Sequence, residues 1–227
     1  SKSSIHCCGW IYFCTQPTKK SLNARIGNHG FSMQFIPMKI VIFASGSGSN
    51  AENIVNHFIG TSIQISAIFC NVEGAGVIQR AERLGIPLEL FNKEEWTTGD
   101  RIDLILSSYQ PDLIVLAGFL WKFPLRLLSK FPHVLNVHPA LLPKFGGKGM
   151  YGMKVHQAVV DAKEIETGIT IHWVNEHYDE GAIIFQATCK IDPNDTPMDV
   201  AQKIHQLEGE HFPRIVEEVL KDIEPKS

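Results

Sequence analysis

From residue 38 onward, short apolar runs alternate with longer segments in which apolar side chains recur every three or four positions. Apolar, β-branched runs are typical of buried strands, and the longer period is typical of helices with one apolar face. Strict alternation of the two predicts an α/β fold with a mostly parallel sheet and helices on both faces. The expected strands span residues 39–44, 63–70, 88–91, 112–116, 134–137, 167–174 and 182–191, and the expected helices span residues 51–58, 76–84, 100–109, 125–130, 153–162 and 196–221.

The last two expected strands differ from the others. Residues 167–174 alternate apolar and polar side chains, as a half-exposed strand does, and residues 175–180 form a turn. We therefore expect residues 182–191 to return as an antiparallel partner at one side of the parallel sheet. The last helix is expected to carry Pro197 in its first turn and to be broken or kinked near Pro213.

The first 37 residues do not share this pattern. They contain no Asp or Glu, carry four basic residues and show no clean helix or strand period. One interpretation is an organelle transit peptide, since such peptides are basic and poor in acidic residues. The other, which we favour because the chain does not begin with Met, is upstream or expression-derived sequence ahead of a true start at Met38. The expected division is an extension over residues 1–37 and one domain over residues 38–227.

Composition and charge narrow the function classes. The net charge of −3 and the lack of a basic stripe interleaved with aromatics give no electrostatic case for nucleic acid. No apolar run approaches the ~20 residues that cross a bilayer. The five cysteines include no CxxC, and no HExxH occurs, so we expect neither a disulfide framework nor a metal site. A cytoplasmic monomer or homodimer, with no nucleic-acid or membrane partner, fits these features best.

A glycine-rich segment, Gly46-x-Gly48-Ser49-Asn50, joins the first expected strand to the first expected helix. Glycines let the backbone approach a ligand, and a helix N-terminus offers unpaired N–H groups to an anion, so a phosphate suits this position. The segment is not a Walker loop, although with Ala51 it fits the loose G-x-G-x-x-A dinucleotide pattern. A tight turn without a ligand is the alternative.

A second motif, Asn136-x-His138, ends the central expected strand and is followed by Pro139 and Pro143. Residues i and i+2 of a strand share a face, so the amide and the imidazole are expected to project side by side. A fixed hydrogen-bond donor beside a group that titrates near neutrality suits an oxyanion and a proton transfer. Asp179, in the turn after residue 174, is a candidate to orient His138 and to raise its pKa, which would keep the imidazole charged near pH 7. A turn-forming aspartate remains the alternative.

These stretches, in this order and spacing, resemble the phosphoribosylglycinamide formyltransferase family, the folate-dependent formyltransferases of purine biosynthesis. The resemblance covers residues 38–218 and is carried by residues 40–50, 112–119 and 136–143 and by Asp179-x-Gly181. It implies a Rossmann-like fold and transfer of a formyl group from 10-formyltetrahydrofolate, a co-substrate, to the amine of glycinamide ribonucleotide, with no metal.

The resemblance also implies a role for each matching residue. The catalytic residues would be Asn136, His138 and Asp179. The substrate phosphate would lie against Gly48, Ser49 and Asn50, and its ribose side against His205 and Glu208, although a glutamate on a helix is by itself more often a solvated side chain. The folate pocket would be lined by Leu120, Trp121, Lys122, Phe123, Asn136, Asn175, Glu176, His177 and Tyr178. Leu120-Trp121 departs from the Met-Arg pair common in the family, and the glycine-rich loop over residues 144–154 is longer than in some members.

Other functions share parts of this pattern. Formyltetrahydrofolate deformylase and methionyl-tRNA formyltransferase use the same Asn-x-His and Asp-x-Gly chemistry, and they are expected to carry a further N-terminal regulatory domain and a further C-terminal RNA-binding domain respectively. A dinucleotide-dependent oxidoreductase is supported by the loose glycine pattern and an acid at Glu73. A folate- or phosphate-binding protein without turnover is the non-enzyme alternative, against which the three retained polar residues argue.

Overall fold

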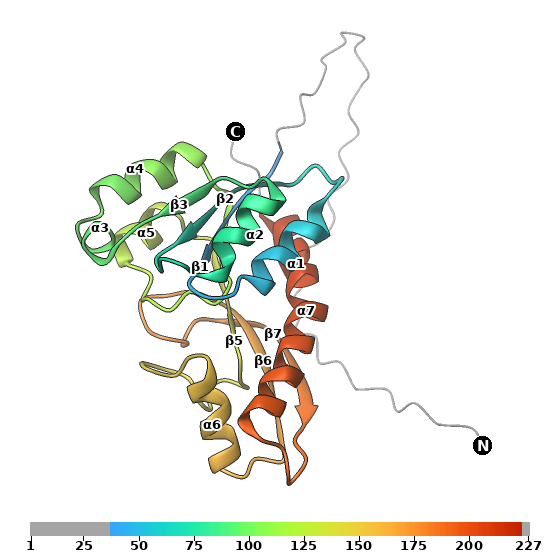
Figure 1. Ribbon diagram of the computed structural model, residues 1–227. Coiled ribbons are helices and arrows are strands. Elements are labelled where there is room, and N and C mark those ends of the chain that lie inside the picture. Colours follow the sequence, from blue (N-terminus) through green and yellow to red (C-terminus); the bar gives the residue numbers. More distant parts are fainter. Residues whose placement is uncertain (1–36, 224–227) are drawn as a thin grey trace, which may run out of the picture. The chain divides into compact units, whose positions relative to one another are not determined.

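The computed structural model describes residues 37–223, and these form one seven-stranded sheet with helices packed against it (Figure 1). The predicted N-terminal extension lies outside the described residues apart from Pro37. Among the described helices, none is both long and apolar enough to cross a membrane. The strands are β1 (Lys39–Ala44), β2 (Gln64–Cys70), β3 (Leu88–Leu90), β4 (Leu113–Leu116), β5 (Val134–His138), β6 (Glu166–Trp173) and β7 (Ile183–Lys190).

The sheet order is β3-β2-β1-β4-β5-β6-β7. The first five strands pair in parallel, and β6 and β7 are added antiparallel beside β5. Both features of the predicted fold are therefore confirmed. The strand order reverses between β1 and β4, and in open α/β sheets ligands bind outside the carboxyl ends of the strands at such a point.

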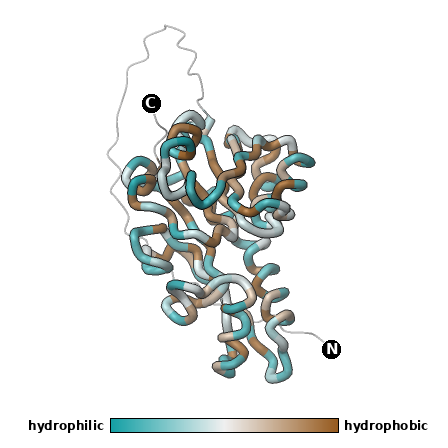
Figure 2. Tube along the Cα trace, turned by 60° about the vertical axis from the view of Figure 1, so that its left-hand side comes forward, coloured by the Kyte–Doolittle hydropathy of each residue, from teal (hydrophilic) through white to brown (hydrophobic). Residues whose placement is uncertain are grey.

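Two helical layers cover the sheet. Figure 1 shows α1, α2 and α7 on one side and α3, α4 and α5 on the other, and α6 packs against α7. Apolar segments run through the middle of the fold, while polar stretches gather on outer turns and loops (Figure 2). The helices are α1 (Ser49–Phe58), α2 (Gly76–Leu84), α3 (Lys93–Thr98), α4 (Asp100–Tyr109), α5 (Leu125–Lys130), α6 (Met153–Asp161) and α7 (Pro197–Asp222).

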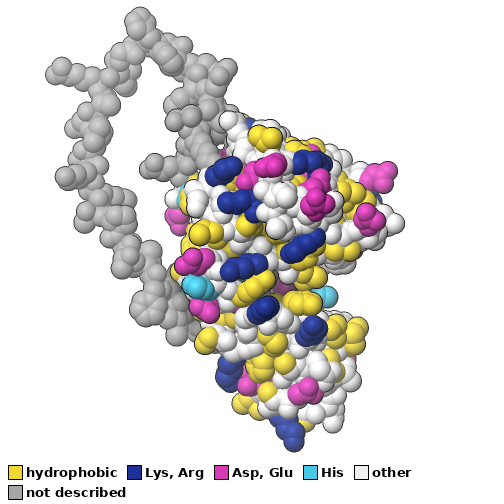
Figure 3. Space-filling view, turned by 90° about the vertical axis from the view of Figure 1, so that its left-hand side faces the viewer, with side chains coloured by type: hydrophobic (Ala, Val, Ile, Leu, Met, Phe, Trp, Pro, Cys, Tyr) yellow, Lys and Arg dark blue, Asp and Glu magenta, His cyan; other side chains and the backbone are white. Residues whose placement is uncertain are grey.

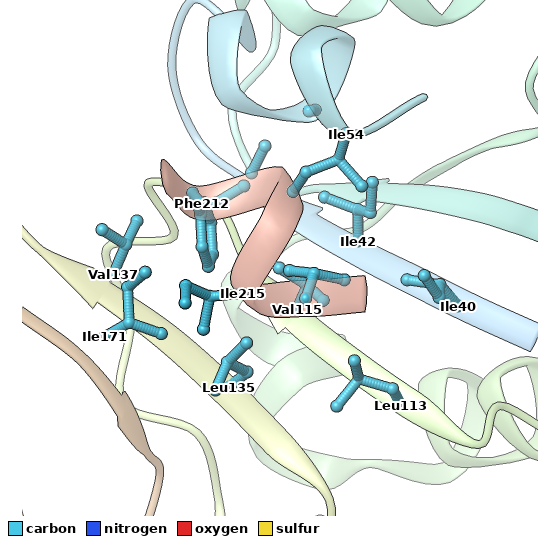
Figure 4. Packing of buried hydrophobic residues seen from close by; sticks show 14 of the residues in the cluster. Ile40, Ile42, Ile54, Leu113, Val115, Leu135, Val137, Ile171, Phe212 and Ile215 are labelled. Atoms are coloured by element: carbon cyan, nitrogen blue, oxygen red, sulfur yellow. The ribbon is translucent and has the colours of Figure 1, made fainter. Parts of the chain in front are cut away.

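The core beneath α7 is built from alternate residues of four neighbouring strands. Figure 4 shows Phe212 and Ile215 of α7 packed over aliphatic side chains from β1, β4, β5 and β6. In β5 these are Leu135 and Val137, and because side chains alternate across a strand, Asn136 and His138 project from the opposite face. Strand β5 thus supplies two aliphatic residues to the core beneath α7 and two polar residues to the opposite face of the sheet.

The structure corrects the predicted elements at three places. Helix α3 was not predicted, because its one buried apolar residue, Trp96, gives no apolar period. The helix begins at a capping box between Asn92 and Glu95. Helix α1 begins at Ser49, two residues earlier than expected, because Gly48 closes the turn in the left-handed conformation. Of the two expectations for Pro213, a break is wrong, since α7 continues through this buried proline as one helix, and a kink stays a prediction.

The buried face of β4 sets a matched pair of stability tests. Leu113 is fully buried in β4, whereas Leu104 in α4 is 73% exposed. Leu113→Ala is expected to lower the free energy of unfolding by about 2–5 kcal/mol, because it removes apolar burial and leaves a cavity. Leu104→Ala should change it by less than about 0.5 kcal/mol. Urea unfolding followed by circular dichroism measures both, and equal losses would contradict this description of the core.

Candidate active site

A cavity of about 590 Å³ opens at the carboxyl ends of β1, β4 and β5, where the strand order reverses. This size is ordinary for a site that binds a small molecule. Segments far apart in the chain line it: the glycine-rich segment after β1, residues 116–123 after β4, the end of β5, the loop over residues 147–152, the β6–β7 turn and one face of α7.

Fifteen of the sixteen residues predicted to form the site lie in the wall of this cavity. The exception is Glu176, whose side chain is 60% exposed and lies beside His177. The lining residues that were predicted are Gly48, Ser49, Asn50, Leu120, Trp121, Lys122, Phe123, Asn136, His138, Asn175, His177, Tyr178, Asp179, His205 and Glu208.

The glycine-rich segment is shaped by helix α2 beneath it. Gly48 has φ of 80°, and a Cβ there would lie 2.6 Å from the Cβ of Val77, so a side chain is excluded twice over. Arg80 of α2 donates from Nε to the Ser47 carbonyl at 2.8 Å and pairs with Glu52 in the first turn of α1. The first N–H groups of α1 have no partner within the helix and lie at the cavity, which makes this segment suited to an anion.

Glu208 of α7 reaches the same segment. Its side chain is buried and accepts a hydrogen bond of 2.9 Å from Nδ2 of Asn50. Burial raises the pKa of Glu208, and the Asn50 hydrogen bond and nearby His205 offset part of that rise. Glu208 is therefore not a solvated helix residue, because it ties the C-terminal helix to the start of α1.

Asn136, His138 and Asp179 all line the cavity, and His138 and Asp179 lie close together. His138 Nδ1 lies 3.5 Å from Asp179 Oδ2, and His138 Nε2 donates to the Phe145 carbonyl at 2.8 Å. The carboxylate of Asp179 also accepts the N–H of Gly147 at 2.9 Å, which holds the glycine-rich loop against the site. Position 181, two residues after Asp179, has to be glycine, because any side chain there would overlap the Trp173 carbonyl. The structure thus brings the predicted trio together.

The charge state of His138 differs from the prediction. Its imidazole is 3% exposed, and burial lowers its pKa below the usual value of about 6.5. The nearby Asp179 and the hydrogen bond to Phe145 raise the pKa but do not outweigh burial. The expectation that Asp179 keeps His138 charged near pH 7 is therefore wrong. Since a backbone carbonyl can only accept, the neutral ring carries its proton on Nε2 and its lone pair on Nδ1.

The part of the cavity wall around Trp121 and Tyr178 carries aromatic side chains with lysines beside them. The amine of Lys122 lies 5.8 Å from the centre of the Tyr178 ring, and that of Lys93 lies 4.5 Å from the Trp121 ring. Phe123 is buried beneath this wall. Figure 3 shows one face of the molecule, on which Lys and Arg side chains are interspersed with apolar ones. Such a surface suits a flat ring system that carries negative charge elsewhere.

Two buried histidines of the cavity were not predicted. His172 on β6 is 2% exposed and lies against Asn136, and His156 on α6 is 3% exposed. Burial, together with nearby His205 and His138, lowers the pKa of His156 to about 4. The sequence did hold a signal for His172, because polar and apolar residues alternate over residues 167–174. Placing its side chain in the site also requires the register between β5 and β6.

Metal binding has no support among the residues that the structure describes, since they contain no group of three or more His, Cys, Asp or Glu side chains able to hold an ion. The predicted absence of a metal stays a prediction.

Comparison with known proteins agrees with the geometry. Residues 38–216 match the formyl transferase family model. The chain is 37% identical over 195 residues to the chloroplastic phosphoribosylglycinamide formyltransferase of Arabidopsis thaliana, covering 81% of this chain and 67% of that protein. It is 34% identical to phosphoribosylglycinamide formyltransferase of Bacillus subtilis, covering 80% of this chain and 94% of that protein.

A solved structure gives the same answer at the level of the fold. Glycinamide ribonucleotide transformylase 1 from Geobacillus kaustophilus is similar with a TM-score of 0.74 and 32% identity, over 81% of this chain and 99% of that one. The matched region contains both the glycine-rich segment and the trio, all of which line the cavity. The chain therefore belongs to the formyl transferase family and, within it, to the phosphoribosylglycinamide formyltransferases.

Proposed function

We propose that Asn136, His138 and Asp179 carry out the formyl transfer of this family, with 10-formyltetrahydrofolate as donor and glycinamide ribonucleotide as acceptor. The observation that carries the assignment is the 3.5 Å approach of His138 Nδ1 to Asp179 in a cavity between an anion-binding helix end and an aromatic wall. One end suits the phosphate of the acceptor, and the other suits the rings of the donor.

The proposed reaction is a direct transfer. The acceptor amine forms a bond to the formyl carbon, and the electron pair of the carbonyl moves onto its oxygen. Asn136 donates a hydrogen bond to this oxyanion, a contribution typically worth a few kcal/mol. The bond from the formyl carbon to N10 then breaks, and the proton lost by the amine goes to N10. No covalent enzyme intermediate is required.

His138 provides the route for that proton. In the neutral imidazole the lone pair is on Nδ1, the ring nitrogen next to Asp179. Nδ1 therefore takes the proton from the attacking amine and passes it to N10. Asp179 stabilises the short-lived imidazolium at 3.5 Å, while the Phe145 carbonyl holds the ring in place. This assignment uses the lowered pKa of His138, because the ring must be neutral to accept a proton.

Substrate binding and location complete the proposal. Gly48, Ser49 and Asn50 bind the phosphate, and His205 and Glu208 face the ribose. Leu120 to Phe123, Asn136 and residues 175–178 contact the folate. We propose one catalytic domain over residues 38–227 that works in the cytoplasm as a monomer or homodimer without a metal; a transit-peptide role for the N-terminal segment is the alternative, since the Arabidopsis relative is chloroplastic.

The direct test is formyl transfer followed by absorbance, with and without glycinamide ribonucleotide. Turnover that requires the amine supports the proposal. Equal turnover without it would mean a deformylase, and binding of both ligands without turnover would mean a binding protein.

His138 is tested by substitution. His138→Gln keeps a donor for the Phe145 carbonyl but has no titratable nitrogen, so kcat is expected to fall by roughly 10²- to 10⁴-fold. Binding of glycinamide ribonucleotide, measured by calorimetry, should change less than about threefold because the phosphate segment is untouched. A near-normal kcat would remove His138 from the proton route.

Asp179 is tested by the pH dependence of kcat/KM. The rate should fall as pH decreases through the pKa of His138, because the protonated ring cannot accept a proton. Asp179 raises that pKa, so Asp179→Asn should move the acidic limb to lower pH and also lower kcat by about tenfold or more, since the imidazolium loses its partner. An acidic limb at the same pH would contradict the coupling.

The anion site is tested by an added charge. Asn50→Asp places a carboxylate at the start of α1 and removes the donor to Glu208, so KM for glycinamide ribonucleotide is expected to rise about tenfold or more. Asn56→Asp adds the same charge at an exposed position at the other end of α1 and should leave KM unchanged. Equal effects of the two variants would show that no anion binds at the N-terminus of α1.

A further inference from the structure

His172 is a buried titratable group that the proposed mechanism does not use. It lies on β6 directly opposite Asn136 of β5 in the antiparallel ladder, and both side chains project from the face opposite the α7 core. Directly opposed residues of such a pair have Cβ atoms about 5 Å apart, which is close enough for side chains to bond. The Asn136 amide nitrogen lies 3.1 Å from His172 Nε2.

The backbone fixes which nitrogen of His172 carries the proton. His172 Nδ1 lies 2.9 Å from the carbonyl oxygen of Trp173, and a carbonyl can only accept, so Nδ1 is the protonated nitrogen. Burial lowers the pKa of His172, so the ring stays neutral near pH 7. Nε2 therefore carries a lone pair and accepts from Asn136.

The same contact fixes the orientation of the Asn136 amide. An Asn side chain has an oxygen that accepts and a nitrogen that donates, and a flip of the amide would exchange them. With a lone pair at His172 Nε2, only the NH₂ end can face β6. The second N–H of that NH₂ group is then fixed in direction as well, at the wall of the cavity.

We infer that His172 is a positioning residue, which holds the Asn136 amide so that it presents an N–H rather than its oxygen to the developing oxyanion. The inference rests on the proposed role of Asn136. The side chain of His172 is only 3% exposed, so it offers little surface to a ligand in the cavity that it helps to line. Without the acceptor at Nε2, the amide can turn its oxygen toward the cavity and repel the negative charge that the reaction develops.

Other groups around His172 do not replace this role. Asp179 Oδ1 lies 3.7 Å from His172 Nε2, which is longer than a hydrogen bond. The Trp173 carbonyl serves only Nδ1. The contact to Asn136 is thus the hydrogen bond in which Nε2 takes part among the described residues.

The experiment is a double-mutant cycle between His172 and Asn136. His172→Phe keeps a ring but removes the acceptor, and we expect kcat to fall roughly 10- to 100-fold, the range that misplacement of a reacting contact produces. KM for both substrates should stay within about threefold. His172→Gln, whose amide can accept from Asn136 and donate to the Trp173 carbonyl, should recover most of kcat.

The Asn136→Ala background separates positioning from a merely structural role. There His172→Phe should lower kcat by less than twofold further, because no amide remains to be oriented. The same fall in both backgrounds, or an unchanged kcat for His172→Phe alone, would overturn the inference. A normal kcat for Asn136→Ala would instead refute the proposed function of Asn136, so the two failures are distinguishable. His57→Phe, which removes a histidine paired with Glu217 away from the cavity, is the control.

A measurement on the unmodified protein does not depend on any variant folding. Nitrogen-15 NMR of the imidazole groups at pH 7 should show His172 as the neutral tautomer protonated on Nδ1. A ring protonated on Nε2, or a charged ring, would overturn the inference, because neither form can accept from Asn136.

Discussion

The two-sidedness of β5 is the constraint on which the rest of the structure depends. Leu135 and Val137 must face α7 to close the core, and the period of a strand then leaves Asn136 and His138 no position other than the opposite face. Four consecutive residues of a helix could not divide between two opposite faces in this way, because a helix repeats about every 3.6 residues and not every two. The stability of the sheet and the placement of the reactive groups are therefore one requirement, because a slip of one residue in β5 would bury the polar pair and expose the aliphatic one.

The antiparallel strands extend the same logic. Adding β6 beside β5 sets His172 opposite Asn136 and Thr170 opposite His138, and the turn after β6 returns Asp179 to the imidazole. A parallel strand at this place would need a long crossover. In the antiparallel arrangement β6 ends beside the start of β5, where Trp173 pairs with Leu135, and the turn that follows folds back to bring Asp179 to His138. The change of strand direction thus supplies the carboxylate that completes the trio.

Much of this was predictable from the sequence, and the rest failed for physical reasons. Strand period and glycine punctuation predicted nearly all elements, and of the site residues that the resemblance implied, all except Glu176 lie in the cavity wall. Helix α3 was missed because a capping box, not an apolar period, defines it. His172 and the burial of Glu208 depend on strand register and helix packing, which local patterns do not contain. The charge of His138 was misjudged because desolvation, invisible in the sequence, outweighs the nearby carboxylate.

The hydrogen bond between Asn50 and Glu208 joins residues 158 positions apart in the chain. During synthesis the glycine-rich segment leaves the ribosome early, but the buried carboxylate that orders Asn50 arrives only with the last helix. Until α7 docks, the start of α1 lacks this partner, and the core beneath Phe212 and Ile215 is open. The ordered start of α1 and the closed core therefore both depend on the packing of the last helix.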